Sequence, residues 1–157
     1  MKNYRNDTYT QVHIHAVFAV KNRQSLILTS WKENLYKYIV TIIQNHCHKV
    51  LAIGGTADHI HILFGLRPSQ SLSDLMREVK GGSSKWINEH RLSNGWFSWQ
   101  EGYGAFSYSK SDLPNVIHYI ETQDEHHIKE SMQTEYRKML QTHGVEYDER
   151  NILKSIE

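Results

Sequence analysis

The sequence contains a single cysteine, Cys47, among its 157 residues. An intramolecular disulfide is therefore impossible and a zinc site built on paired cysteines is excluded, so we expect a reducing, cytoplasmic environment and a packed thiol. No apolar run reaches the roughly 18 residues that a membrane-spanning helix needs. Residues 1–15 are too polar for a secretory signal, and we expect no membrane partner.

The sequence also lacks an excess of charge of either sign. It has 18 lysine and arginine residues against 17 aspartate and glutamate residues, a net charge of +1. A strongly basic chain would indicate a nucleic-acid partner, so any such site must here be a local patch. With 39% hydrophobic residues, the chain can bury the core of one domain over 1–157. We expect the core over about 9–125 and a C-terminal helix and tail over about 126–157.

Four segments have the composition of β-strands. The first is rich in β-branched and aromatic residues and lacks glycine and proline, which is typical of a strand buried on both faces. The second and third form a hairpin that turns at Gly54-Gly55, and the fourth is aromatic with spaced glycines. The expected strands cover 9–20, 49–53, 58–66 and 97–108.

Four other segments have the periodicity of helices. Ser30 and Glu33 have the spacing of a capping box at the start of the first helix. Either Ser71 or Ser73 caps the second helix. The expected helices cover 30–45, 71–90, 113–123 and 127–143.

The order of the first six elements, β-α-β-β-α-β, predicts the split βαβ or ferredoxin-like arrangement. In this arrangement a four-stranded antiparallel sheet carries helices on one face. The expected fold class is therefore α+β, with extra C-terminal helices after the ferredoxin-like core.

Two histidines, His59 and His61, lie within the third predicted strand. Because strand side chains alternate, both imidazoles must point to one face, where they can bind one metal ion. Short His-x-His patterns also arise by chance, and His13-Ile14-His15 has the same spacing on the first strand. Spacing alone therefore does not decide which pair, if either, binds metal.

Tyr119 and Gln123 lie four residues apart in the third predicted helix. Residues at this spacing share one helical face, so a phenol and a carboxamide lie side by side there. An arbitrary pair of this kind more often consists of a packed ring and a solvated amide. The spacing is compatible with both interpretations.

A glycine pair, Gly81-Gly82, interrupts the second predicted helix. Each glycine lowers helix stability by about 1 kcal/mol, so either the helix breaks there or its backbone approaches another element closely. Exposed backbone N–H groups and flanking side chains could hold a DNA phosphate, although an interrupted helix with surface lysines fits equally well. The flanking side chains are Lys80, Ser83, Ser84 and Lys85.

Four motifs together resemble the single-tyrosine HUH transposases, which include the TnpA transposases of small insertion sequences and the REP-associated tyrosine transposases. No motif is specific alone, but the four follow the family's order within a likeness that runs from about Val12 to about Tyr147. The motifs are Asp58-His-Ile-His-Ile-Leu-Phe, Lys80-Gly-Gly-Ser-Ser, Trp99-Gln-Glu-Gly-Tyr-Gly-Ala-Phe-Ser and Tyr119-Ile-Glu-Thr-Gln.

The resemblance implies an enzyme that cleaves and rejoins single-stranded DNA at element ends through a covalent 5′-phosphotyrosine. Tyr119 would be the nucleophile, and His59, His61 and Gln123 would bind a divalent metal ion. Nitrogen and oxygen ligands without cysteine favour Mg²⁺ or Mn²⁺.

The resemblance also implies partners for the chain. These are single-stranded DNA hairpins at element ends and a second copy of the chain in a homodimer. The segment after the first strand resembles a basic segment of the family, so Lys21 and Arg23 become candidate contacts with the DNA backbone.

Two other functions compete with this one. A ferredoxin-like sheet with aromatic residues can bind single-stranded nucleic acid without catalysis, and this alternative predicts an exposed aromatic pair on the central strands. A metal-dependent hydrolase would use water as its nucleophile, and would keep cleaving after Tyr119→Phe.

Overall fold

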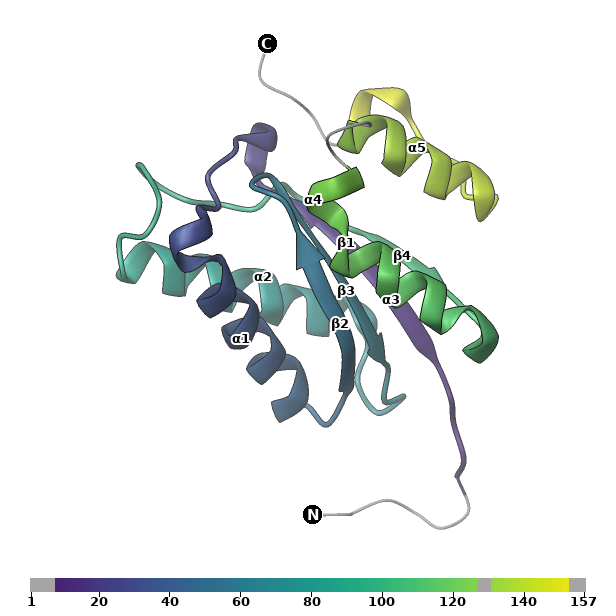
Figure 1. Ribbon diagram of the computed structural model, residues 1–157. Helices are drawn as coiled ribbons and strands as arrows, with labels where there is room; N and C mark the ends of the chain where they lie inside the picture. The colour runs from purple at the N-terminus through teal and green to yellow at the C-terminus, as the bar shows by residue number, and fades with distance from the viewer. Residues whose placement is uncertain (1–7, 127–130, 153–157) are drawn as a thin grey trace.

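The structure is a computed structural model that describes residues 8–126 and 131–152. Four strands form one sheet in the order β2-β3-β1-β4, in which every pair of neighbours is antiparallel. β1 and β3 are therefore the central strands (Figure 1). The predicted α+β class and the element order of the core are confirmed. The strands are β1 (His13–Ala19), β2 (Lys49–Gly55), β3 (His59–Gly65) and β4 (Gly104–Ser107).

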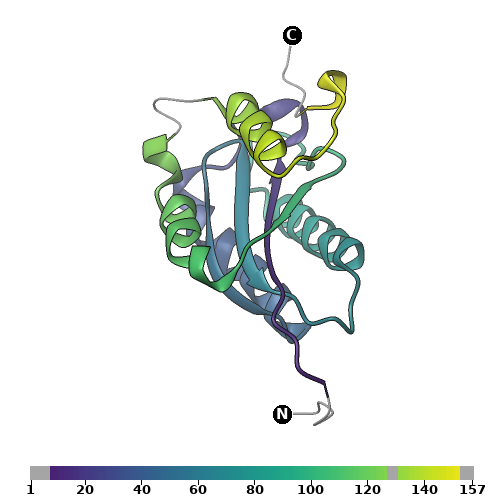
Figure 2. The ribbon, with the colours of Figure 1, turned by 90° about the vertical axis from the view of Figure 1, so that its right-hand side faces the viewer.

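The helices divide between the two faces of the sheet. α1 and α2 pack on one face, as the ferredoxin-like arrangement predicts, and the later helices α3 and α5 pack on the other (Figure 1). Figure 2 shows α2 and α3 on opposite sides of the strands. The helices are α1 (Thr29–Asn45), α2 (Leu72–Glu89), α3 (Leu113–Glu121), α4 (Gln123–His126) and α5 (Met132–Thr142), with short 3-10 turns at Lys21–Arg23, Lys110–Asp112 and Glu149–Asn151.

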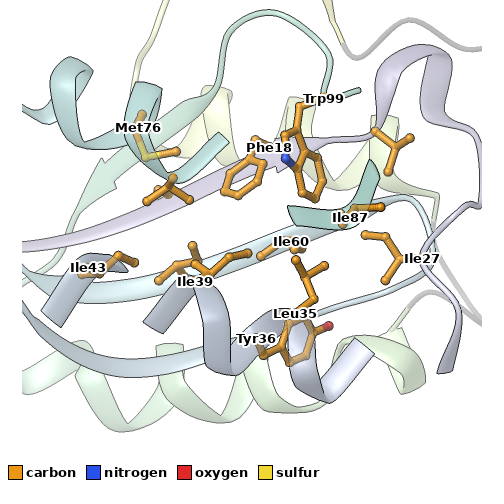
Figure 3. Packing of buried hydrophobic residues seen from close by; sticks show 14 of the residues in the cluster. Phe18, Ile27, Leu35, Tyr36, Ile39, Ile43, Ile60, Met76, Ile87 and Trp99 are labelled. Carbon is orange, nitrogen blue, oxygen red and sulfur yellow. The ribbon is translucent and has the colours of Figure 1, made fainter. Parts of the chain in front are cut away.

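The main apolar core lies between the sheet and helices α1 and α2 (Figure 3). Ile60, Ile62 and Phe64 alternate along β3, point into this core and are fully buried. Figure 3 shows Phe18 of β1 and Ile39 of α1 in the same layer. Because side chains alternate along a strand, the residues between them face α3 and α5.

The glycine pair in α2 does not break the helix, which runs continuously through it. A Cβ atom on Gly82 would lie 3.1 Å from Cδ1 of Ile42 in α1, whereas one on Gly81 would meet nothing within 4 Å. Of the two predicted explanations, the close approach is correct, and only Gly82 marks it.

The capping box predicted at the start of the first helix is wrong. α1 begins at Thr29, its N-cap is Leu28, and no side chain caps it, so Ser30 lies inside the first turn. For the second helix, the prediction is confirmed at Ser71, whose Oγ accepts a hydrogen bond from the backbone N–H of Asp74 at 3.1 Å.

Several element bounds also differ from the predictions. The first strand begins four residues later than expected, and β4 covers only the end of the predicted segment 97–108, which begins with an irregular stretch. Gly54-Gly55 lies at the end of β2 rather than in the turn, because residues 56–58 make the connection. The predicted last helix begins at Met132 in the described chain, and residues 127–130 lie outside it.

Cys47 is exposed rather than packed. It follows the end of α1 with a φ of 67°, in the left-handed region, where the chain turns toward β2. Across residues 8–126 and 131–152, no helix is long and apolar enough to cross a membrane.

Candidate active site

His59 and His61 lie on the face of β3 that is turned away from the main core. Both side chains are fully buried, at 0% exposure, beneath α3 and α5. Their ring centroids lie 5.0 Å apart. The predicted placement of both imidazoles on one face of the strand is therefore correct.

The ring of His59 is held in place by hydrogen bonds at Nδ1. Asp58 Oδ1 lies 2.6 Å from this nitrogen, and Thr56 Oγ1 lies 2.9 Å from it. Arg23 approaches the other carboxylate oxygen of Asp58 at 3.4 Å. Burial alone would raise the pKa of Asp58, but its bonds to His59 and Thr56 and the charge of Arg23 lower that pKa to about 2. The carboxylate therefore fixes the ring so that Nε2 points into the site.

The ring of His61 is held by a third histidine, His15, which belongs to the second His-x-His pair that the sequence left open as a metal-binding candidate. Nε2 of His15 on β1 lies 2.7 Å from Nδ1 of His61. Burial lowers the pKa of His15 well below its usual range, and the charge of His61 lowers it further. A neutral His15 can accept the Nδ1–H of His61, which leaves Nε2 of His61 as a ligand atom.

Gln123 brings an amide oxygen to His59. Its Oε1 lies 3.1 Å from Nε2 of His59, and the residue is only 1% exposed. The predicted continuous helix is interrupted just before it, because Thr122, with φ −110° and ψ 28°, separates α3 from α4. Gln123 still donates a hydrogen bond from Nε2 to the backbone oxygen of Tyr119 at 3.1 Å.

Tyr119 lies on α3 with its ring against the histidines. The ring is half-buried and stands edge-on to His61, with centroids 5.7 Å apart, and 6.3 Å from the ring of His15. The structure therefore brings together, within one chain, the four residues that the resemblance predicted for catalysis and metal binding.

Glu135 on α5 is a fifth member of the site, and the sequence analysis missed it. Its Oε1 lies 3.1 Å from Nε2 of His61, and the residue is only 5% exposed. A signal was available: at helical spacing, Glu135 falls on the apolar stripe that Met132 and Met139 form. An acidic residue on the buried face of a helix indicates a partner in the interior.

The donor atoms fit a divalent cation. One nitrogen each from His59 and His61 and one oxygen from Glu135 all lie within 4.8 Å of one another. Adjacent ligands of an octahedral ion at about 2.1 Å lie about 3 Å apart, close to the 3.1 Å between Glu135 Oε1 and His61 Nε2 and the 3.1 Å between Gln123 Oε1 and His59 Nε2. Imidazole, amide and carboxylate donors without cysteine suit Mg²⁺ or Mn²⁺.

Beside this cluster, α3 and α5 line a hollow of about 320 Å³. Tyr119 and Glu135 reach it from the site, and Lys138 is an exposed cation on its wall. Tyr108 and His143, which share a 3.2 Å hydrogen bond, line it as well. The hollow connects the tyrosine to the surface of the protein.

Among the predicted DNA contacts, Lys80 and Ser83 have internal roles. Lys80 donates from Nζ to the backbone oxygens of Gln100 and Gly102, each at 2.7 Å. Ser83 is fully buried, donates to Val79 O at 2.6 Å and accepts from the Trp99 indole at 2.9 Å. Because α2 is continuous, its central N–H groups bond within the helix and are not available to a phosphate.

The remaining predicted contacts are more varied. Lys21 is exposed, and Lys85 is exposed with its Nζ 3.7 Å from Glu89 of the same helix. Ser84 is half-buried and donates to the backbone oxygen of Gly81 at 3.2 Å. Arg23 is half-buried and pairs with Asp58, the residue that orients the His59 ring, so its charge is used within the protein.

Comparison with known proteins gives a family. The model of the family described as "Transposase IS200 like" matches residues 8–123, most of the chain. The chain belongs to this family of transposases. It also resembles the ISDra2 transposase TnpA of Deinococcus radiodurans, at 24% identity over 128 residues that cover 78% of this chain and 91% of that protein. The predicted membership among the single-tyrosine transposases is confirmed.

Two solved structures of transposases share the fold. One is a putative transposase from Deinococcus radiodurans R1, with a TM-score of 0.60 and 22% identity, covering 78% of this chain and 98% of that one. The other is a REP-associated tyrosine transposase bound to a REP hairpin, with a TM-score of 0.56 and 19% identity, covering 76% and 70%. The ferredoxin-like arrangement is therefore that of known transposases.

Proposed function

We propose that this transposase cleaves and rejoins single-stranded DNA at element ends through a covalent 5′-phosphotyrosine on Tyr119, with a divalent metal ion held by His59, His61 and Gln123. The observation that carries the proposal is the edge contact between Tyr119 and His61, beside the 3.1 Å approach of Gln123 to His59. A phenol, two imidazoles and an amide oxygen meet on one sheet face.

Tyr119 supplies the nucleophile. When bound, a divalent ion would polarise the scissile phosphate and stabilise negative charge on its oxygens. The phenol oxygen attacks phosphorus and loses its proton, and the bond from phosphorus to the 3′ oxygen breaks. The 3′ oxygen gains a proton and leaves as a 3′-hydroxyl, so the protons balance. Attack of another 3′-hydroxyl on the phosphotyrosine reverses these changes and rejoins DNA, so the bond energy is conserved without ATP.

Gln123 links the nucleophile to the metal ligands. Its carbonyl oxygen approaches His59, while its Nε2–H donates to the backbone oxygen of Tyr119. One side chain thus fixes the position of α3 relative to the histidines. Asp58 has the matching role on the other side, because it orients the His59 ring.

Exposed cations provide the proposed contacts with the DNA backbone. Lys21 and Lys85 are the candidates whose charge faces solvent, and Ser84 lies next to Lys85 on α2. Lys80, Ser83 and Arg23 are engaged within the protein, so we expect their substitution to weaken DNA binding only indirectly, through local packing. We also propose that the DNA partner is a hairpin, that the chain forms a homodimer and that it acts in the cytoplasm.

A denaturing gel tests the nucleophile. The purified protein is incubated with Mn²⁺ or Mg²⁺ and single-stranded oligonucleotides from the DNA that flanks its gene, each labelled at the 3′ end. We expect a metal-dependent label that migrates with the protein, that EDTA prevents and that Tyr119→Phe abolishes. Tyr38→Phe changes a half-buried tyrosine of α1 that stacks on Trp86 of α2, on the opposite face of the sheet; it is the matched control and keeps the adduct.

The same gel separates the alternatives. Cleavage that survives Tyr119→Phe without an adduct would assign the chain to metal-dependent hydrolysis. Binding of every oligonucleotide without cleavage would favour the non-catalytic module. The burial of β1 from His15 to Ala19 and of β3 from His59 to Phe64 argues against that module, because base stacking needs exposed aromatic rings on the central strands.

A further inference from the structure

Glu135 is an acidic residue in an apolar setting. It lies on the face of α5 that packs on the sheet, where its helical neighbours Met132 and Met139 join Val17 and Phe106 in one buried cluster. Burying a carboxylate in such surroundings is costly unless a cation or hydrogen-bond donors compensate for the lost water. The buried carboxylate of Glu135 is therefore stable only beside a cation or hydrogen-bond donors.

Glu135 and the histidines together form a group of donor atoms that could hold a cation. Glu135 Oε1 is 3.1 Å from His61 Nε2, which matches the 3.1 Å between Gln123 Oε1 and His59 Nε2. Each pair has about the spacing of neighbouring ligands on one six-coordinate ion. Both histidine rings are also oriented by a partner at Nδ1, which is Asp58 for His59 and His15 for His61. Their Nε2 atoms therefore face these oxygens.

We propose that Glu135 is a fourth protein ligand of the divalent cation, so that cation binding holds α5 onto the sheet. This inference rests on the cation of the proposed function and adds to it a ligand that the family motifs do not contain. Glu135 is the one anionic donor of the set, and carboxylates suit the hard ions Mg²⁺ and Mn²⁺. Four protein ligands on a six-coordinate ion leave two positions for substrate oxygens.

The four donors come from three separate parts of the chain. His59 and His61 belong to β3, Gln123 begins α4, and Glu135 belongs to α5. Since binding free energies are reciprocal, an ion that these donors share must stabilise the docked position of α5 by as much as docking strengthens ion binding. α5 also lines the hollow beside Tyr119, so ion binding and the shape of this hollow become linked.

Titration calorimetry with MnCl₂ tests the ligand directly, on the full chain after treatment with EDTA and without DNA. We expect Glu135→Gln to weaken Mn²⁺ affinity by more than about tenfold, because an uncharged amide replaces the only anionic donor. Glu146→Gln, a change of an exposed acid after the same helix, is the matched control and leaves affinity unchanged. Unchanged affinity in Glu135→Gln would overturn the proposal and leave Glu135 as a hydrogen-bond partner of His61.

A second measurement follows the helix itself. Hydrogen exchange of residues 132–142 should slow when Mn²⁺ is added to the unsubstituted chain, and should not change in Glu135→Gln. Glu135→Leu is a second variant in case Glu135→Gln misfolds. It removes the buried charge from an apolar cluster, so it should fold well and lose Mn²⁺ affinity to the same degree. Equal slowing in all three proteins would contradict the link between the ion and α5.

The outcomes also separate this inference from the proposed function. If the unsubstituted chain forms the metal-dependent tyrosine adduct but Glu135→Gln binds Mn²⁺ normally, only the role of Glu135 fails. If the unsubstituted chain binds no Mn²⁺ and forms no adduct, the proposed function is wrong, and the role of Glu135, which rests on it, is wrong as well.

Discussion

The two faces of the sheet carry different kinds of side chain, although the same strands supply both. On the face toward α1 and α2, β3 presents Ile60, Ile62 and Phe64 to the main apolar core. On the face toward α3 and α5, the same strand presents His59 and His61, which contact other polar groups. The first face is mainly apolar, whereas the second combines apolar packing with the buried polar groups of the proposed site.

The difference shows how a small domain can keep a buried polar site. An apolar layer on one side of a strand fixes its backbone, so the side chains on the other side are held within the narrow tolerance that a metal site needs. Nδ1 of each buried imidazole on β3 has a protein partner, Asp58 for His59 and His15 for His61. The apolar face therefore supports the polar one without contacting it.

Substitutions at adjacent positions of β3 should break the two faces separately, and they give the largest expected effects. His61→Ala should lower Mn²⁺ affinity by about 100-fold or more and abolish the tyrosine adduct, because a ligand is lost. Ile62→Ala should lower the free energy of unfolding by about 2–5 kcal/mol and leave Mn²⁺ affinity per folded molecule unchanged. Calorimetry and urea unfolding of the metal-free proteins measure the two quantities.

The comparison fails if the two variants lose the same property. If Ile62→Ala, measured below its unfolding transition, loses Mn²⁺ affinity to the same degree as His61→Ala, then the apolar face is not independent of the site. A loss of folding stability in His61→Ala that exceeds that of Ile62→Ala would lead to the same conclusion.

Much of the apolar face could be predicted from the sequence. Local periodicity and composition identified all four strands and helices α1 and α2, because each of these elements except the short β4 contributes apolar side chains to the main core. The start of α1 was mispredicted, since a serine and a glutamate at the right spacing need not adopt cap geometry when the N-cap lies two residues earlier, at Leu28. The predicted first and last residues of helices and strands were wrong where local sequence signals and tertiary packing favour different end points.

The polar face was predictable only in part. Strand alternation and the family resemblance predicted a site of His59, His61, Tyr119 and Gln123, and the structure places these four side chains together. His15 and Glu135 were missed because their roles depend on which strands pair and on where α5 docks, and both are tertiary facts. The pairing of β1 with β3 follows from the ferredoxin-like order, so His15 could have been placed near the site by that argument.

A change one step away from the metal ligands should have an intermediate effect. Asp58→Asn should weaken Mn²⁺ affinity by about 10- to 100-fold, because the neutral amide orients the His59 ring less well and makes its nitrogen a poorer donor. Calorimetry on the metal-free protein measures this loss. Asp124→Asn is the control, since Asp124 is an exposed acid next to Gln123 that approaches Lys32 rather than a histidine. Equal losses in both variants would mean that any nearby negative charge suffices, and that the orientation of His59 is not what matters.

The smallest expected effects belong to the glycine pair of α2, on the apolar side. Gly81→Ala should raise the free energy of unfolding by about 1 kcal/mol, because alanine favours the helix and its methyl group meets no atom within 4 Å. Gly82→Ala should gain less, since its methyl group would lie 3.1 Å from Ile42 Cδ1, which must move aside. Urea unfolding of both variants measures the difference. Mn²⁺ affinity should stay unchanged in both, because α2 and the histidines lie on opposite faces; a change in either variant would show that the two faces are coupled through the sheet.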